Sequence, residues 1–158
     1  MIPDLLKLFK QFKNSDKTPL EDFNTETFAG IMNLYVNVKD ELIESLFKLP
    51  QDNYRVSTQL KKDLKDDVNC IIDLVLEGDE NICFIENKVN SHEGYKQLER
   101  YSKVLKEYYP QKKQFLFYCT KNSDPKNSDS KFDQFNFKQF RWYEIAKKLQ
   151  HFSKTENV

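Results

Sequence analysis

The chain has little glycine, histidine and cysteine. Among its 158 residues there are 3 Gly, 2 His and 3 Cys. There is no glycine-rich loop of the kind that cradles a phosphate, no serine in a nucleophile elbow and no Cys–His arrangement. Cys70, Cys83 and Cys119 lie far apart in apolar runs and lack CxxC spacing, so we expect buried structural thiols instead of a zinc site or disulfides. The remaining candidates for catalytic residues are therefore carboxylates and lysines.

Long apolar runs are also missing. No stretch approaches the roughly 20 apolar residues of a membrane-spanning helix, and residues 1–13 are amphipathic, unlike a signal peptide. We therefore expect a cytoplasmic protein. Hydrophobic residues make up 39% of the chain and aromatic residues 14%, which is sufficient for the core of one domain. The net charge is zero, but residues 80–158 carry 15 Lys and Arg against 10 Asp and Glu, which is compatible with a polyanionic partner.

The periodicity predicts an α/β (α+β) fold with helices on the faces of a mixed sheet of about five strands. We expect one domain over residues 1–150 and a tail or linker over 151–158, with a solvated, mobile loop over 121–134. An extra N-terminal helix is predicted over residues 2–13, and a second helix is predicted to be capped at Asn24 or Thr25 and to continue to Tyr35. Further helices are predicted over 38–49, 95–108 and 143–149, and strands over 54–60, 70–77, 82–89, 114–120 and 135–142.

The predicted hairpin of strands 70–77 and 82–89 carries charge inside apolar runs. A register symmetric about its turn places Asp73 opposite Glu86, with Cβ atoms ~4.5–5.5 Å apart. Lys88 shares a face with Glu86 because side chains two residues apart lie on the same side of a strand. Two opposed carboxylates destabilise a strand pair, and a divalent cation would offset their repulsion. A slip of one residue would separate Asp73 from the other two.

A site made of Asp73, Glu86 and the backbone carbonyl of Asn87 would suit Mg²⁺, for which Mn²⁺ can substitute. Such an ion activates water and stabilises a phosphate, and Lys88 would orient the nucleophile. This set is typical of phosphodiester hydrolysis. The alternative is an exposed strand face with an ordinary charge pair. The apolar residues on both sides of each strand argue against that alternative.

Three further residues have weaker signals. Glu26 is explained by the helix dipole, which favours carboxylates near a helix start, so the pattern alone favours a structural role. Gln97 and Tyr101 are one turn apart on one face of the predicted helix over 95–108. The pattern assigns neither of them a role.

The sequence from Asp73 through Glu86-Asn87-Lys88 to Gln97 and Tyr101 resembles the PD-(D/E)XK nuclease superfamily, with its restriction-endonuclease-like fold. Segments 21–29 and 140–145 resemble its first core helix and its closing segment. The resemblance implies that Asp73 and Glu86 bind metal and that Lys88 is catalytic. It also implies that Glu26 is an extra ligand, that Gln97 contacts substrate or a metal-bound water, and that Tyr101 supports the site. Ile72 replaces the proline of the family name, which leaves activity open.

The leading hypothesis is a Mg²⁺-dependent nuclease acting on DNA. The resemblance also suggests bacterial defence or mobile-element biology as its setting, and it leaves homodimerisation open. One alternative is a catalytically silent module of the same fold that binds nucleic acid or a protein. Another is a structural or inhibitory partner domain that uses its Phe and Tyr surface.

Overall fold

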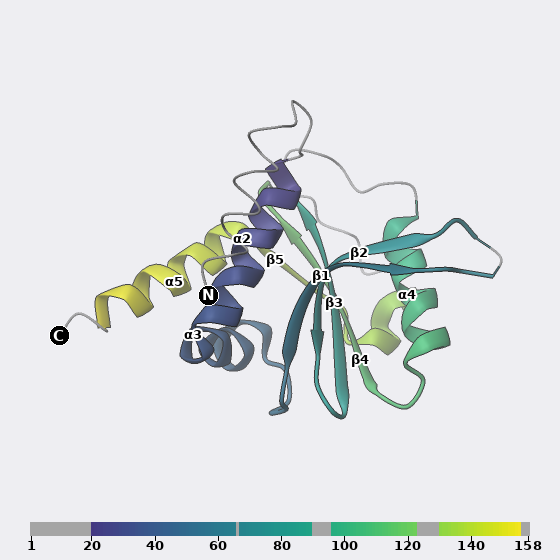
Figure 1. Cartoon of the computed structure of the whole chain (residues 1–158), viewed down its shortest axis with the longest axis horizontal. Helices are drawn as coiled ribbons and strands as arrows, with labels where there is room; N and C mark the ends of the chain where they lie inside the picture. Colours follow the sequence, from purple (N-terminus) through teal and green to yellow (C-terminus); the bar gives the residue numbers. More distant parts are fainter. Residues whose placement is uncertain (1–19, 66, 90–95, 123–129, 156–158) are drawn as a thin grey trace.

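Five strands form one mixed sheet in the order β1-β2-β3-β4-β5 (Figure 1). The structure is a computed structural model and describes residues 20–65, 67–89, 96–122 and 130–155. The first three strands are antiparallel, and β4 and β5 run parallel to β3. The predicted mixed α/β fold is confirmed. The strands are β1 (Arg55–Lys62), β2 (Cys70–Glu77), β3 (Asn81–Lys88), β4 (Lys113–Thr120) and β5 (Lys138–Arg141).

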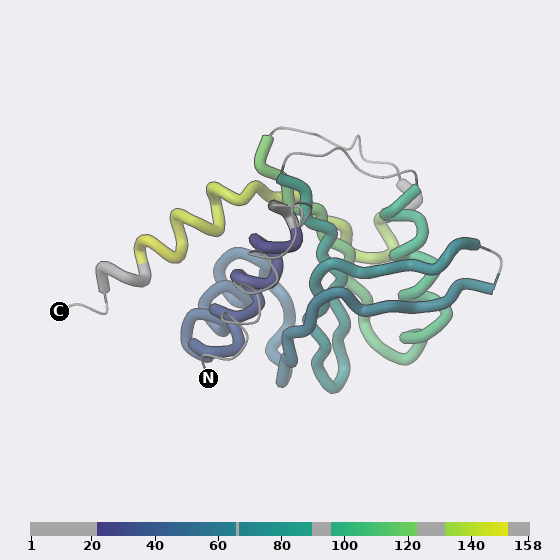
Figure 2. The backbone as a smooth tube through the Cα atoms, turned by 45° about the horizontal axis from the view of Figure 1, so that its top comes forward, coloured from purple at the N-terminus to yellow at the C-terminus, as the bar shows by residue number. Residues whose placement is uncertain are grey.

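Helices cover both faces of the sheet, as Figures 1 and 2 show. One face carries α2 (Leu20–Leu34), α3 (Val36–Glu41), the π-helix η1 (Leu42–Phe47) and α5 (Trp142–Thr155), and their buried side chains form the first core with the sheet. The other face carries α4 (Gln97–Tyr108) and the 3₁₀ helix η2 (Ser130–Phe135), which form the second core. In the described parts of the chain, no helix is both long and apolar enough to span a bilayer.

Several sequence predictions about local structure are confirmed. The hairpin register pairs Glu77 with Ile82, as expected from the polar turn between two apolar strands. The three cysteines are buried and form no disulfide. The helix predicted over 2–13 lies outside the described residues, as does much of the predicted loop over 121–134.

The predicted start and end of the second helix are wrong. Helix α2 already begins at Leu20, so Asn24 and Thr25 lie within the helix and do not cap it. The helix ends at Leu34, and Tyr35 adopts a non-helical conformation before α3. The segment predicted as one helix over 38–49 is divided between α3 and the π-helix η1, which ends where Lys48 adopts a left-handed conformation.

The segment before β5 also differs from its prediction. Residues 130–135, expected to belong mostly to a solvated loop, form η2, which buries Phe132 and Phe135 in the second core. This segment folds onto the sheet because burying its two phenylalanine side chains is more favourable than leaving them exposed in a solvated loop. Strand β5 is shorter than expected, since Trp142 begins α5. That helix continues to Thr155, into the predicted tail, while the domain boundary at residue 150 stays a prediction.

The strands β1 and β2 change face part-way along their length. In a regular strand, side chains two or four residues apart share a face. In β1, however, Val56 lies in the first core while Leu60 packs against the second. In β2, Ile72 lies in the second core and Leu74 in the first. Both strands therefore reverse their faces at the same level of the sheet.

The reversal occurs at Gln59 and Asp73. These two residues face each other in the register, but the pairing skips them and resumes on either side. Gln59 has a positive φ of 51°, which is uncommon for a residue with a side chain and marks a local kink. Beyond this kink, the paired ends of β1 and β2 project past α4 (Figures 1 and 2).

Candidate functional site

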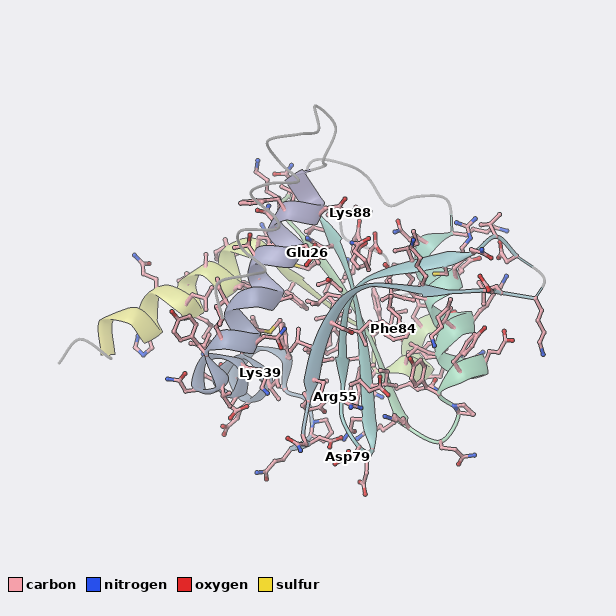
Figure 3. All side chains as sticks on the ribbon, in the orientation of Figure 1. Glu26, Lys39, Arg55, Asp79, Phe84 and Lys88 are labelled. Carbon is pink, nitrogen blue, oxygen red and sulfur yellow. The ribbon has the colours of Figure 1, made fainter. Side chains whose placement is uncertain are left out.

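Glu86, Lys88 and Asp73 are brought together at one end of β3. The Glu86 side chain is fully buried, and Lys88 Nζ lies 2.6 Å from its Oε1 atom. The described part of the chain donates no well-aligned hydrogen bond to either oxygen of Glu86. Buried carboxylates normally accept hydrogen bonds or pair with a cation. The Oε1 atom is paired with Lys88, whereas Oε2 accepts no hydrogen bond from the described residues. Figure 3 shows Lys88 at this end of the sheet, close to α2.

The two carboxyl groups of the site influence each other. Burial, and then the charge of Asp73, raise the pKa of Glu86 to about 8 against the opposing effect of Lys88. Burial also raises the pKa of Asp73, although the Asn87 N–H and the Lys88 ammonium group oppose this, and the charge of Asp22 adds to the rise. The pair therefore resists full ionisation unless positive charge is added between or beside the two carboxyl groups.

Asp73 is held by hydrogen bonds at its side chain and at its backbone N–H. The Asn87 N–H donates to Asp73 Oδ2 at 3.0 Å. The Asp73 N–H donates to the hydroxyl oxygen of Tyr101 at 2.8 Å, and that hydroxyl donates to the Ile71 carbonyl at 3.1 Å. Tyr101 is fully buried on α4. Its hydroxyl thus bonds to β2 where the pairing with β1 is interrupted. The role of Tyr101 in supporting the site stays a prediction.

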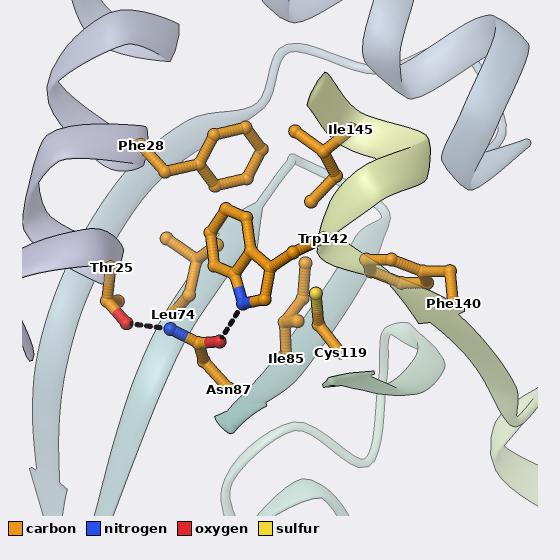
Figure 4. A pocket seen from close by; sticks show the side chains of 9 residues that line it. All are labelled: Thr25, Phe28, Leu74, Ile85, Asn87, Cys119, Phe140, Trp142 and Ile145. Carbon is orange, nitrogen blue, oxygen red and sulfur yellow. Dashed lines mark hydrogen bonds between the residues drawn. The ribbon is translucent and has the colours of Figure 1, made fainter. Parts of the chain in front are cut away.

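The side chain of Asn87 points away from the two carboxylates because residues alternate along a strand. On the first-core side, its Nδ2 atom donates to Thr25 Oγ1 at 2.6 Å. Its Oδ1 atom accepts a hydrogen bond from Trp142 Nε1 at 2.5 Å. Figure 4 shows this chain of side chains from α2 through β3 to α5. The sequence analysis considered Thr25 only as a possible helix cap and gave Trp142 no role in the site, because no local pattern indicates a contact across such distances in sequence.

The charge of Asp22, on α2, contributes to the raised pKa of Asp73, and the sequence analysis did not single out this residue. Glu26, which was proposed instead, lies one helical turn later and is partly buried (Figure 3). The i, i+4 spacing of the two acids was the available signal, since it places them on the same helical face. Gln97 begins α4 one turn before Tyr101 and is also partly buried. The roles of Glu26 and Gln97 stay predictions.

The donor set fits a hard divalent cation. Asp73 and Glu86 supply carboxylate oxygens, and Lys88 pairs with only one of them, Glu86 Oε1, while Glu86 Oε2 accepts no hydrogen bond from the described residues. Among the described residues there is no group of three or more His, Cys, Asp or Glu side chains that could hold a metal. Mg²⁺ does not require one, because it binds through one or two carboxylates and keeps several waters.

A sequence model of the PD-(D/E)XK nuclease superfamily matches residues 28–157. The chain belongs to this superfamily. The match includes Asp73, Glu86, Lys88 and Tyr101 but begins after Glu26, so it leaves the acidic residues of α2 without comparison. No curated protein matches the chain.

Two solved structures are similar to this superfamily member. One is a crystal structure of AF1548, a protein of unknown function, with 17% identity and a TM-score of 0.40 over 68% of this chain. The other is VC1899 from Vibrio cholerae, with 10% identity and a TM-score of 0.46 over 84% of this chain. The aligned regions span 59% and 34% of those two proteins.

Proposed function

We propose that this chain is a Mg²⁺-dependent nuclease that hydrolyses phosphodiester bonds in DNA. The observation that carries the proposal is the state of Glu86, a fully buried carboxyl group beside Asp73 whose two oxygens receive no well-aligned hydrogen bond from the described residues. The single positive charge of Lys88 can balance only one of the two carboxylates, so keeping both of them ionised is costly unless a further cation binds. Membership of the PD-(D/E)XK nuclease superfamily supports the same chemistry.

Each site residue has a role in this proposal. Asp73 and Glu86 would hold the ion, together with the backbone carbonyl of Asn87. Mg²⁺ bound there would supply positive charge for a phosphate oxygen and would lower the pKa of an attacking water. The Lys88 ammonium group, which is mostly buried beside Glu86, would orient that water and stabilise negative charge developing on the phosphate.

The remaining predicted residues would act around this centre. Tyr101 would hold Asp73 through its backbone, in keeping with their 2.8 Å hydrogen bond. Glu26 would add a carboxylate ligand from α2, and Gln97 would contact the substrate or a metal-bound water. A cytoplasmic location, homodimerisation and a setting in bacterial defence or mobile-element biology stay predictions from the sequence.

Lys88→Met tests the proposal. Wild-type protein is incubated with supercoiled plasmid and with single-stranded DNA in Mg²⁺ or Mn²⁺, and parallel reactions contain EDTA. We expect cleavage that EDTA abolishes and that Lys88→Met lowers by about 100-fold or more, because the variant lacks the ammonium group that stabilises charge at the phosphate. Lys147→Met is the matched control, since Lys147 is exposed on α5 and should leave the rate unchanged.

Two outcomes would contradict the proposed mechanism. Cleavage that persists in EDTA would exclude a role for the divalent ion, and full activity of Lys88→Met would exclude Lys88. DNA binding without any cleavage would instead favour the alternative of a catalytically silent nucleic-acid-binding module. An RNA oligonucleotide of the same sequence tests the choice of DNA.

A further inference from the structure

We infer that the side chain of Asn87 is a positioning group for the metal site, held in place from the opposite face of the sheet by Thr25 and Trp142. This inference rests on the proposed function, because it assigns a cause to the geometry of the same two carboxylates. It adds two residues, on α2 and α5, that contact the Asn87 side chain on the opposite face of the sheet from the two carboxylates.

The end of β3 is supported unequally by its neighbouring strands. On the β4 side, the pairing continues to the last residue, Lys88, opposite Thr120. On the β2 side, the pairing described here stops at Leu74 and Ile85. Beyond that point, the Asn87 N–H donates to the Asp73 carboxylate at 3.0 Å. The orientation of the Asn87 peptide therefore acts directly on the position of Asp73.

The Asn87 side chain fixes that orientation through two directional hydrogen bonds. An indole N–H can only donate, so the contact with Trp142 Nε1 assigns the amide oxygen to that side. The amide nitrogen is then left to donate to Thr25 Oγ1 at 2.6 Å. Asn87 is only 3% exposed and Thr25 only 2%, so water does not compete freely for these bonds. Two helices thus hold one side chain of β3.

The space around this side chain would allow it to move if one bond were lost. A cavity of about 10 Å³ lies beside it and is lined in part by Thr25, Asn87, Trp142 and Cys119 (Figure 4). This volume is about that needed for one water molecule. Losing the hydrogen bond to the hydroxyl or to the indole N–H would let the amide rotate toward this space, and the backbone N–H bonded to Asp73 belongs to the same residue.

The test uses Thr25→Val and Trp142→Phe, each of which removes one hydrogen-bonding group and keeps most of the side-chain volume. The first measurement needs no metal: hydrogen exchange of the Asn87 amide, followed by NMR, with the Phe84 amide of the same strand as reference. We expect exchange at Asn87 to accelerate roughly tenfold while that at Phe84 stays unchanged, because the loss of one hydrogen bond shifts the local opening equilibrium by about this factor.

The second measurement is the affinity for Mn²⁺, determined by calorimetry. We expect both variants to raise the Kd about tenfold, since residues that orient metal ligands typically change affinity by 10–100-fold. Thr27→Val is the matched control: its hydroxyl lies two residues along α2, is buried and has no hydrogen-bond partner among the described residues. Thr25→Ser, which keeps the hydroxyl group, should restore both the exchange rate and the Kd.

The outcomes separate this inference from the proposed function. Unchanged exchange at Asn87 in both variants would overturn the inference, as would faster exchange with an unchanged Kd. An equal effect of Thr27→Val would also overturn it, because the loss would then be a general effect on α2. Wild-type protein that binds no Mn²⁺ would refute the proposed function, and the exchange rates would still decide whether Thr25 and Trp142 fix the Asn87 amide.

Discussion

The hydroxyl oxygen of Tyr101 accepts a hydrogen bond from the backbone N–H of Asp73 at 2.8 Å, at the position where β2 loses its pairing with β1. Tyr101→Phe would leave this N–H without its partner. We expect the free energy of unfolding to fall by about 1–3 kcal/mol, the usual cost of leaving a buried donor unsatisfied. Urea denaturation followed by circular dichroism measures the change.

Tyr35→Phe is the control for this substitution. Tyr35 is 57% exposed, so the loss of its hydroxyl should change the stability by less than about 0.5 kcal/mol. If Tyr101→Phe were as stable as the wild type, the hydroxyl group would not be replacing the missing strand pairing. A weaker Mn²⁺ affinity of Tyr101→Phe would show, in addition, that the same hydrogen bond positions Asp73.

The stability of the metal-free protein should fall as the pH rises. Burial, and then the charge of Asp73, raise the pKa of Glu86 to about 8, above its usual value of 4.5. Between these two values the folded protein binds more protons than the unfolded chain, so rising pH favours unfolding. We expect a loss on the order of 3 kcal/mol between pH 4.5 and pH 8. Urea denaturation in EDTA across this range measures it.

Glu86→Gln provides the comparison for this pH dependence. The amide cannot ionise, so the stability of the variant should vary less with pH and should exceed that of the wild type at pH 8. Mg²⁺ should stabilise the wild type most strongly at high pH, where the site loses its proton more readily, and should not stabilise the variant to the same extent. A wild-type stability that stays constant from pH 4.5 to pH 8 would contradict the buried, shifted carboxyl group.

The turn of the β2–β3 hairpin is capped by Asp52. Its carboxylate accepts hydrogen bonds from the backbone N–H groups of Asp79, Glu80 and Asn81, and from the Asn81 side chain. Asp52→Ala should therefore lower the free energy of unfolding by about 1–2 kcal/mol. The loss is this small because water competes for hydrogen bonds at a partly exposed site. These bonds hold the pKa of Asp52 below its usual range. The contribution is thus present above pH ~4 and is lost as the pH falls below it.

Gly78 tests the same cap from the other side. A methyl group at position 78 would overlap the Asp52 carboxylate, which its hydrogen bonds hold in place. Gly78→Ala should therefore destabilise the wild type, but much less so in the Asp52→Ala background, where the overlap is removed. Urea denaturation of the four proteins gives the coupling free energy. Equal effects of Gly78→Ala in both backgrounds would show that the carboxylate is not the obstacle.

Much of the sheet could be predicted because its pattern is local. The apolar alternation and the polar turn predicted that Glu77 pairs with Ile82, and the same register predicted that Asp73 lies close to Glu86. A nearly continuous apolar run identified β4 as buried on both faces. The candidate residues Glu86 and Lys88 were found for the same reason, since charge inside an apolar strand can be seen in the sequence without any long-range contact.

Other features depend on contacts between distant segments. Thr25 looked like a helix cap because threonine favours that position, but its hydroxyl accepts a hydrogen bond from Asn87, 62 residues away. The effect of Asp22 on the pKa of Asp73 depends on how α2 lies across the sheet. Phe132 and Phe135 were expected in or beside a polar loop, and only the second core shows where they are buried.

By itself, the sequence determined the order of the elements, the hairpin register and the presence of carboxylates and a lysine at one end of a strand, because propensity, alternation and turn chemistry act over a few residues. The tertiary structure decided how these groups are held. Three features each join segments far apart in the chain: the kink at Gln59 and Asp73, the hydroxyl of Tyr101 beside it, and the hydrogen bonds of the Asn87 side chain to α2 and α5. Their geometry follows from packing two cores against a single sheet, which no local pattern encodes.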